Sequence, residues 1–196
     1  MCIIILMIVT RFSQDIFLLF FGLLIAIFIG LQAQFDRTFP SEHLIGITHL
    51  VQQPDDITCG PTTMCMMMSY YGLEKEIDEI KKITKTVWYS FSGRDFGMTA
   101  PVMIQSGLNY FNFNSKLKYG NIKNLKHMIG LGKPCIVLVR SGEWNWHYIL
   151  VYGYNKDYIF FVNPSSGELE GLSSDEFAAA WSWYCLLYTS DAADDT

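Results

Sequence analysis

The sequence predicts an α+β domain in which N-terminal helices pack on a mainly antiparallel sheet. Three observations support this class: a helix pattern over residues 59–72, a β-hairpin pattern over residues 146–162, and a capping-box spacing from Ser173 ahead of an apolar run at residues 177–181. Helix patterns come first and strand patterns follow, so the elements are segregated along the chain. Residues 34–184 have the size of one domain, and no repeat or proline-rich linker divides them.

The first predicted helix spans residues 59–72. Pro61 and Thr62 suit a first helical turn, and an apolar stretch follows over residues 64–68. Gly72 stands where a helix commonly ends in a left-handed residue.

Cys59 therefore lies at the N-terminus of this helix, directly after the polar loop 53–58. Free N–H groups and the helix dipole stabilise an anion there and lower the pKa of a thiol. Cysteine is often a buried core residue instead, and Cys65, in the middle of the same helix, is interpreted that way. The position after a polar loop favours a reactive role for Cys59.

Several elements are predicted between this helix and the hairpin. Ile77, Ile80 and Ile83 share one face at helical spacing, and Thr99 suits an N-cap. The predicted elements are a surface helix over residues 73–84, a loop near the cleft over 87–98, a helix over 100–107, a strand over 110–117, a helix over 122–129 and a central strand over 134–140.

The hairpin pattern brings His147 and Asn163 together. Two β-rich runs flank turn residues 155–157, and opposed residues of an antiparallel pair have a constant index sum, here about 310 to 312. His147 and Asn163 should therefore lie across from each other, or within a residue or two, on one face. The Asn163 oxygen can accept the imidazole N–H and leave the other nitrogen for a thiol. The alternative is a half-exposed strand histidine beside a turn-forming Asn-Pro.

Gln53 is the candidate oxyanion donor. A side-chain amide just before a nucleophile can aim its NH₂ at a developing oxyanion, together with the backbone N–H of Cys59. Gln52 is equally suitable by chemistry, and either residue can simply be a solvated loop residue.

Together these features resemble the papain-like cysteine peptidases related to the bacteriocin-processing, double-glycine leader peptidases, over roughly residues 50–181. The features are Gln53 six residues before Cys59-Gly60, a helix that ends Tyr70-Tyr71-Gly72, Gly132-Lys133-Pro134 before an apolar strand, His147-Tyr148 opening another strand, and Asn163-Pro164. The resemblance implies a papain-like fold, with Cys59 as nucleophile, His147 as general base, Asn163 as orienting residue and Gln53 as oxyanion donor.

One position departs from the leader peptidases, which usually have Asp where this chain has Asn163. An asparagine can orient the imidazole but lacks the charge that stabilises imidazolium, so a weaker ion pair or reduced activity is an alternative. Papain itself uses asparagine, so catalysis is still expected.

The expected activity is hydrolysis of peptide bonds in a peptide or protein substrate. Two alternatives use the same site: an acyl or amide transferase, and a catalytically degenerate peptide-binding module. We expect no cofactor and no metal, because the cysteines and four histidines have no paired metal-ligand spacing. A mild negative charge and the lack of a glycine-rich phosphate loop argue against nucleic-acid binding. The sequence does not predict an oligomeric state.

The N-terminal residues 1–33 are predicted to be a signal peptide or an N-terminal membrane anchor. Residues 16–31 carry no charge, Arg11 precedes them, and Ala33 suits cleavage before Gln34. The resemblance implies that, in the leader-processing transporters of this family, a cytosolic peptidase precedes the membrane part. Here the apolar segment precedes the peptidase, so we expect a secreted or periplasmic domain, with membrane contact only through an uncleaved N-terminal segment.

Residues 185–196 form a separate tail. Residues 185–195 are similar to the translation of a common sequencing adapter, so we interpret the tail as an artefact and exclude it from the predicted fold. Without its three aspartates the formal net charge changes from −5 to −2.

Overall fold

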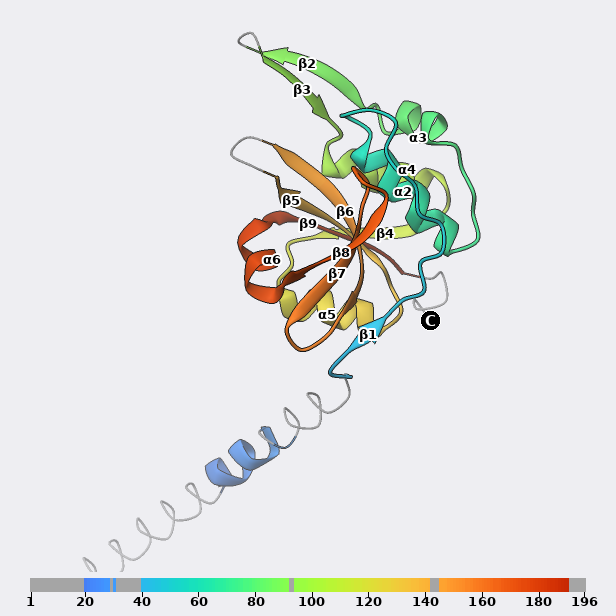
Figure 1. Cartoon of the computed structure of the whole chain (residues 1–196). Helices are drawn as coiled ribbons and strands as arrows, with labels where there is room; N and C mark the ends of the chain where they lie inside the picture. The colour runs from blue at the N-terminus through green and yellow to red at the C-terminus, as the bar shows by residue number, and fades with distance from the viewer. Residues whose placement is uncertain (1–19, 29, 31–39, 92–93, 142–144, 191–196) are drawn as a thin grey trace, which may run out of the picture. The chain divides into compact units, whose positions relative to one another are not determined.

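A computed structural model of the 196-residue chain describes residues 20–28, 30, 40–91, 94–141 and 145–190 (Figure 1). The chain divides into two compact units, Met1–Pro40 and Ser41–Thr196. In the first unit, residues 20–28 are helical, and much of the predicted export or anchor segment lies outside the described residues. Among the helices of the described ranges, none has both the length and the apolar character to cross a membrane.

The second unit contains the helices and strands that build the site. In chain order they are β1 (His43–Leu44), α2 (Cys59–Tyr70), α3 (Ile77–Ile83), β2 (Val87–Phe91), β3 (Arg94–Met98), α4 (Pro101–Tyr110), β4 (Asn114–Lys118), α5 (Ile122–Gly130), β5 (Cys135–Arg140), β6 (Trp146–Tyr154), β7 (Tyr158–Asn163), β8 (Glu168–Ser173), α6 (Ser174–Ala180) and β9 (Trp181–Ser190).

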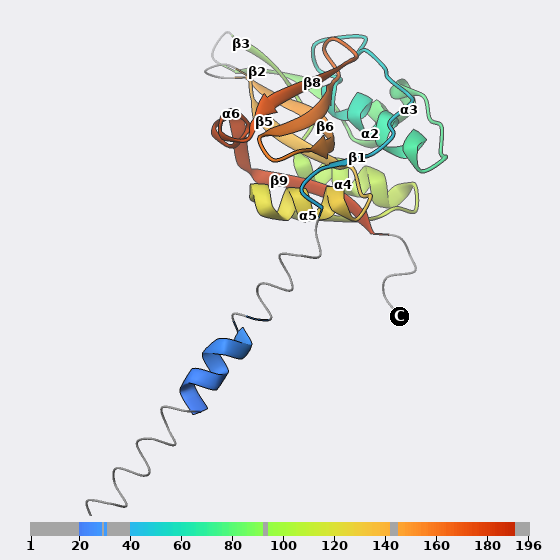
Figure 2. The ribbon, with the colours of Figure 1, turned by 60° about the horizontal axis from the view of Figure 1, so that its bottom comes forward.

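The described strands form a seven-stranded sheet and a separate two-stranded hairpin. The main sheet has the order β4-β9-β5-β6-β7-β8, β1 pairs with β6, and every pairing is antiparallel. Figures 1 and 2 show β5, β6 and β7 side by side, with helices packed against the sheet. The predicted α+β class, with helices on a mainly antiparallel sheet, is confirmed.

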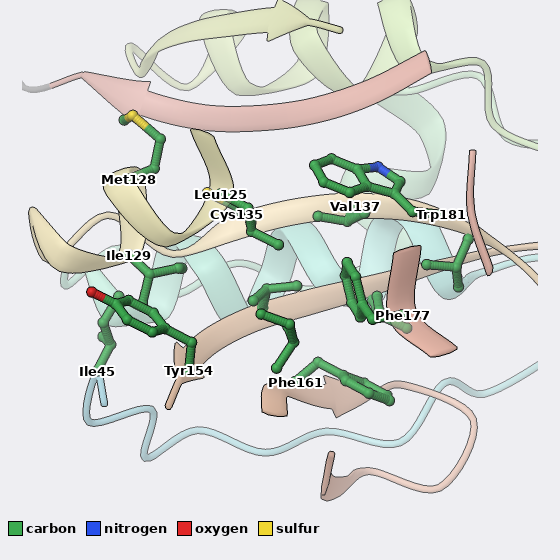
Figure 3. Packing of buried hydrophobic residues seen from close by; sticks show 14 residues of the cluster. Ile45, Leu125, Met128, Ile129, Cys135, Val137, Tyr154, Phe161, Phe177 and Trp181 are labelled. Carbon is green, nitrogen blue, oxygen red and sulfur yellow. The ribbon is translucent and has the colours of Figure 1, made fainter. Parts of the chain in front are cut away.

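Successive side chains of a strand point to opposite faces of the sheet. On the central strands, side chains on both faces are buried. Ile136 and Leu150 pack in one core with the methionines of α2. Cys135 and Val137 pack in the other core with residues of α5 and α6, including Leu125 and Phe177 (Figure 3). The sheet therefore holds α2 firmly on one face, and the N-terminal end of α2 is fixed relative to β6.

The prediction of a loop over residues 87–98 was wrong, because residues 87–91 and 94–98 form the paired strands β2 and β3 (Figures 1 and 2). Gly97 of β3 lies directly against Ile57, where any side chain would collide. Glycine at this position indicated a loop in the sequence, but here it permits a close approach between the hairpin and the segment before Cys59.

Other boundaries moved for similar reasons. The helix predicted to end near Gly107 continues to Tyr110, because this glycine allows tight packing rather than a turn: a Cβ there would lie 2.9 Å from Cγ2 of Thr84. The following strand therefore begins at Asn114, later than predicted.

Two further strands of the sheet, β8 and β9, were not predicted. Strand β9 lies between β4 and β5, and its residues 185–190 belong to the C-terminal tail, residues 185–196. The capping box at Ser173 and Glu176 is present, and the predicted last helix is α6.

Candidate active site

Cys59 is the first residue of α2, and the first turn of this helix leaves N–H groups free for its sulfur. The N-cap residue, Thr58, makes no side-chain cap; its hydroxyl donates to the Asp55 carbonyl oxygen at 3.1 Å instead. The backbone N–H groups of Cys59 and Gly60 therefore remain available, and both lie against the Cys59 sulfur. The polar loop thus positions the thiol at the helix N-terminus, as predicted.

Gly60 lets this first turn pack closely on β6. A Cβ at Gly60 would lie 2.9 Å from Cδ1 of Ile104 and 3.2 Å from Cδ2 of Tyr148. Tyr148 is itself held in place because its hydroxyl donates to the Thr99 carbonyl oxygen at 2.7 Å. The backbone N–H of Tyr148 also lies against the Cys59 sulfur, so the thiol is adjacent to the strand residue that follows His147.

The electrostatic surroundings of Cys59 act in both directions. Burial raises the pKa of the thiol above its ordinary value of 9.0, the three backbone N–H groups lower it, and the negative charge of Asp55 raises it further. The N–H groups at the helix N-terminus lower this pKa, as expected, but the desolvation of the sulfur outweighs them. The resting thiol is neutral near pH 7.

His147 and Asn163 lie close together at the ends of β6 and β7. Nε2 of His147 and Oδ1 of Asn163 are 2.9 Å apart, so Nε2–H can donate to the amide oxygen and Nδ1 remains free. The predicted proximity is confirmed, although the two residues are not directly opposed. Leu150 pairs with Val162 in the register, and a bulge follows Val151, so His147 reaches Asn163 diagonally.

The imidazole of His147 is neutral at rest. Burial lowers its pKa below 6.5, while the hydrogen bond to Asn163 and the negative charge of Glu170 raise it in part. A neutral imidazole is the form that can accept a proton from a thiol.

Sequence reasoning missed the residues that surround Asn163. Nδ2 of Asn163 donates to Oε1 of Glu170 at 2.8 Å, and the hydroxyl of Ser166 donates to the same oxygen at 3.0 Å. The backbone N–H of Ser165 donates to Oδ1 of Asn163 at 3.0 Å. The turn composition of Asn163-Pro164-Ser165-Ser166-Gly167 was the signal that a second hairpin returns Glu170 to this place.

Gln53 lies beside the turn that follows Asn163. Its backbone N–H donates to the Pro164 carbonyl oxygen at 2.8 Å, and its amide Nε2 donates to the Asp55 carbonyl oxygen at 2.8 Å. Gln52, the chemical alternative, is exposed, and its amide donates to the Ser165 carbonyl oxygen. Of the two amides, Gln53 is the one that is partly buried in the loop leading to Cys59.

The four predicted site residues lie on distant segments of the chain and are linked by the following contacts. Contacts through Tyr148 link Cys59 to β6, a side-chain hydrogen bond joins His147 to Asn163, and a backbone hydrogen bond joins Gln53 to Pro164. Among the described residues, no hydrogen bond connects the Cys59 sulfur directly with the His147 ring. Such contacts are often long in an unliganded enzyme and shorten when substrate binds.

The other described cysteines have different surroundings. Cys65 is buried, and its thiol donates to the Lys75 carbonyl oxygen at 3.2 Å. Cys135 is fully buried in β5, and burial raises the pKa of its thiol strongly. Within the described ranges, no group of three His, Cys, Asp or Glu side chains is placed to hold a metal ion.

Several solved structures similar to this chain are peptidase domains. The peptidase domain of Streptococcus ComA, a bi-functional ABC transporter involved in quorum sensing, matches with a TM-score of 0.61 and 22% identity, covering 72% of this chain and 98% of that domain. A double glycine motif protease from an AMS/PCAT transporter, in complex with the leader peptide, matches with a TM-score of 0.59 and 16% identity, covering 76% and 95%. These likenesses establish the fold.

Sequence comparison gives the family. The chain is 25% identical over 139 residues to the lactococcin-G-processing and transport ATP-binding protein LagD of Lactococcus lactis subsp. lactis, and the match covers 70% of this chain but only 18% of LagD. The family of Peptidase C39 matches residues 48–193, which is most of the second unit. The chain therefore belongs to the Peptidase C39 family and is a papain-like cysteine peptidase.

Proposed function

We propose that Cys59, His147 and Asn163 form the catalytic triad of this peptidase, with Gln53 as an oxyanion donor. One observation carries the proposal: the ring of His147 is hydrogen-bonded to Asn163 at 2.9 Å, and the next residue of β6 places its N–H against the Cys59 sulfur. These contacts support a nucleophile, a base and an orienting group that act together near the ends of β6 and β7.

The reaction begins from a neutral thiol and a neutral imidazole. The Cys59 sulfur bonds to the carbonyl carbon of the scissile peptide while its proton passes to Nδ1 of His147. The imidazolium gives this proton to the leaving nitrogen as the C–N bond breaks, which leaves a thioester. Water then attacks the thioester, His147 accepts a proton from that water, and the acid is released as the proton returns to the sulfur.

The negative oxygen of each tetrahedral intermediate needs donors. The backbone N–H of Cys59 supplies one, and the Gln53 amide supplies the other after rotation of its side chain. Only one hydrogen of that NH₂ group is occupied by the Asp55 carbonyl oxygen. The buried Oε1 of Gln53 has no hydrogen-bond partner among the described residues, which favours reorientation when substrate arrives.

The substrate is proposed to be a peptide or protein segment. The AMS/PCAT relative was solved with a leader peptide, and LagD is a processing protein by name, which supports a peptide that is cut from a precursor. A peptide library with product identification by mass spectrometry would define the cleavage site.

The test compares two cysteines of one helix. Cys59→Ser should abolish turnover of a peptide substrate, whereas the matched variant Cys65→Ser should retain nearly all of it. Equal losses in the two variants would refute the assignment of Cys59. Added amine separates hydrolysis from transfer: a free carboxylate product supports the peptidase, while an amide product indicates a transferase. Tight peptide binding without any product would indicate a degenerate binding module.

We also propose that the N-terminal segment exports the domain, as a cleaved signal peptide or as an anchor. The uncharged run at residues 16–31 supports this proposal. Cell fractionation of the full chain, with N-terminal sequencing of the mature protein, tests it. Recovery of the uncleaved chain in the cytosol would contradict it.

A further inference from the structure

The geometry points to Glu170 as a positioning residue of the catalytic site, which acts on His147 through Asn163. This inference rests on the proposed triad and adds a fourth member to it. Glu170 lies on β8, and its carboxylate oxygen Oε1 accepts from Nδ2 of Asn163 at 2.8 Å. The chain of contacts is therefore carboxylate, amide and imidazole.

The first effect of Glu170 is to fix which way the Asn163 amide faces. The two ends of an asparagine amide are similar in size, so hydrogen bonds alone decide its orientation. With Oδ1 toward His147, the amide accepts from Nε2–H at 2.9 Å and from the Ser165 N–H at 3.0 Å, while Nδ2 donates to the carboxylate. The reversed amide would aim its oxygen at the carboxylate and its NH₂ at the Ser165 N–H, so both contacts would become repulsive.

This orientation in turn fixes the tautomer of His147. For Nε2 to donate to this oxygen, the proton must be on Nε2, and the Ser165 hydroxyl, 3.4 Å from the same nitrogen, can accept from it as well. The lone pair is then on Nδ1. Nδ1 is the nitrogen that the proposed mechanism uses to accept the thiol proton. The carboxylate thus selects the reactive form of the base without touching it.

The second effect is the charge of Glu170. Asn163 stabilises an imidazolium only through its hydrogen bond, and the carboxylate hydrogen-bonded behind it adds a negative charge at longer range. In agreement, the negative charge of Glu170 raises the pKa of His147 against the effect of burial. Among the described residues, Glu170 is the charged side chain that acts on this ring.

Two features fix the position of the Glu170 carboxylate. The hydroxyl of Ser166 donates to its Oε1 at 3.0 Å, and pairing of β7 with β8 sets Glu170 opposite Phe161, two residues before Asn163. The side chain is half-buried, so water screens its charge less than that of an exposed carboxylate. Glu168 lies on the same strand and is exposed, which makes it the matched control.

The direct test is ¹⁵N NMR of the histidine rings in the full chain, with His147→Gln used to assign the His147 signal. In the unmodified protein we expect the tautomer with the proton on Nε2, and in Glu170→Gln a mixture of tautomers and a lower pKa of His147. The peptide kcat/KM of Glu170→Gln should fall several-fold, because less of the base is in the reactive tautomer and its pKa is lower. Glu168→Gln should change none of these quantities, and Glu170→Asp should restore part of the tautomer preference.

A double-mutant cycle shows whether the effect passes through the amide. In an Asn163→Ala background, Glu170→Gln should change kcat/KM much less than it does alone, because the amide that transmits its effect is gone. A full additive loss, or an unchanged tautomer in Glu170→Gln, would overturn the inference. Thermal unfolding of each variant separates this role from a loss of fold.

The NMR readout needs no substrate. If no peptide is cleaved but the tautomer shifts in Glu170→Gln, the proposed peptidase substrate fails and the role of Glu170 stands. If peptides are cleaved through Cys59 but the tautomer is unchanged, the triad stands and the role of Glu170 fails.

Discussion

The first turn of α2 and its middle carry the same side chain in opposite surroundings. Cys59 is partly exposed, with N–H groups of Cys59, Gly60 and Tyr148 around its sulfur. Cys65 is buried, donates to a carbonyl oxygen, and has its pKa raised by burial and by Glu76 and Glu74. The comparison teaches that position along a helix decides the chemistry of a thiol: one end offers donors to a sulfur anion, and the middle does not.

The largest expected effect comes from removal of the proposed base, His147. Without it Cys59, like Cys65, has no base to accept its proton. His147→Ala should lower kcat by about 10²- to 10⁴-fold, the usual contribution of a general acid–base residue. Peptide hydrolysis by the purified chain measures it. The exposed His49 is the control, because His49→Ala should leave kcat unchanged. A variant without His147 that keeps its activity would show that another base serves Cys59.

A second experiment compares the two thiols directly. Alkylation by iodoacetamide at pH 7.5, read by peptide mapping, should modify Cys59 markedly faster than the buried Cys65 and Cys135. The reason is access to solvent together with the N–H groups at the sulfur. Equal rates for Cys59 and Cys65 would contradict a difference in reactivity between the first turn and the middle of α2.

The pH dependence sharpens the comparison further. Burial lowers the pKa of His147 from 6.5 and raises that of Cys59 from 9.0, so the neutral pair is stable between these values. In a profile of kcat/KM, which reports the free enzyme, activity should fall only below pH 6.5, where His147 gains a proton. An acid limb well above pH 6.5 would mean that the imidazole is held in its charged form instead.

The smallest expected effect concerns the fit of the first turn on β6. Gly60→Ala places a methyl group 2.9 Å from Cδ1 of Ile104, and such overpacking costs about 1–3 kcal/mol of unfolding free energy. We expect a lower Tm and a several-fold lower kcat/KM, since the turn shifts away from Tyr148. Adding Ile104→Val removes Cδ1 and should recover most of both losses. If Gly60→Ala leaves Tm and kcat/KM unchanged, close packing at Gly60 does not position Cys59.

The parts of the fold that were predictable have local signals. Pro61 and Gly72 mark the two ends of the cysteine helix region, and turn residues 155–157 fix a hairpin whose register brings His147 near Asn163. The capping box at Ser173 likewise predicted α6. In each case, chemistry within a few residues dictates the local geometry.

The parts that were not predictable depend on tertiary contact. Residues 87–98 were predicted to be a loop, and only the close contact between Gly97 and Ile57 explains why a glycine stands in a strand there. The pKa of Cys59 depends on burial, which no local sequence pattern reveals. Glu170 belongs to no motif. It reaches Asn163 only because the Ser165–Ser166 turn reverses the chain, and a carboxylate on an exposed strand has no sequence signature of its own.

The hydrogen bond from the Gln53 N–H to the Pro164 carbonyl oxygen ties together two loops that are more than a hundred residues apart in the chain. Gly167 packs closely on the backbone of Gln52: a Cβ at Gly167 would lie 3.1 Å from the Gln52 nitrogen. This is a second contact between the same two loops. The loops that carry Gln53 and Asn163 are therefore joined at two points. In the proposed mechanism, a peptide that displaces one of these loops also displaces the other, so substrate entry and the alignment of His147 are coupled.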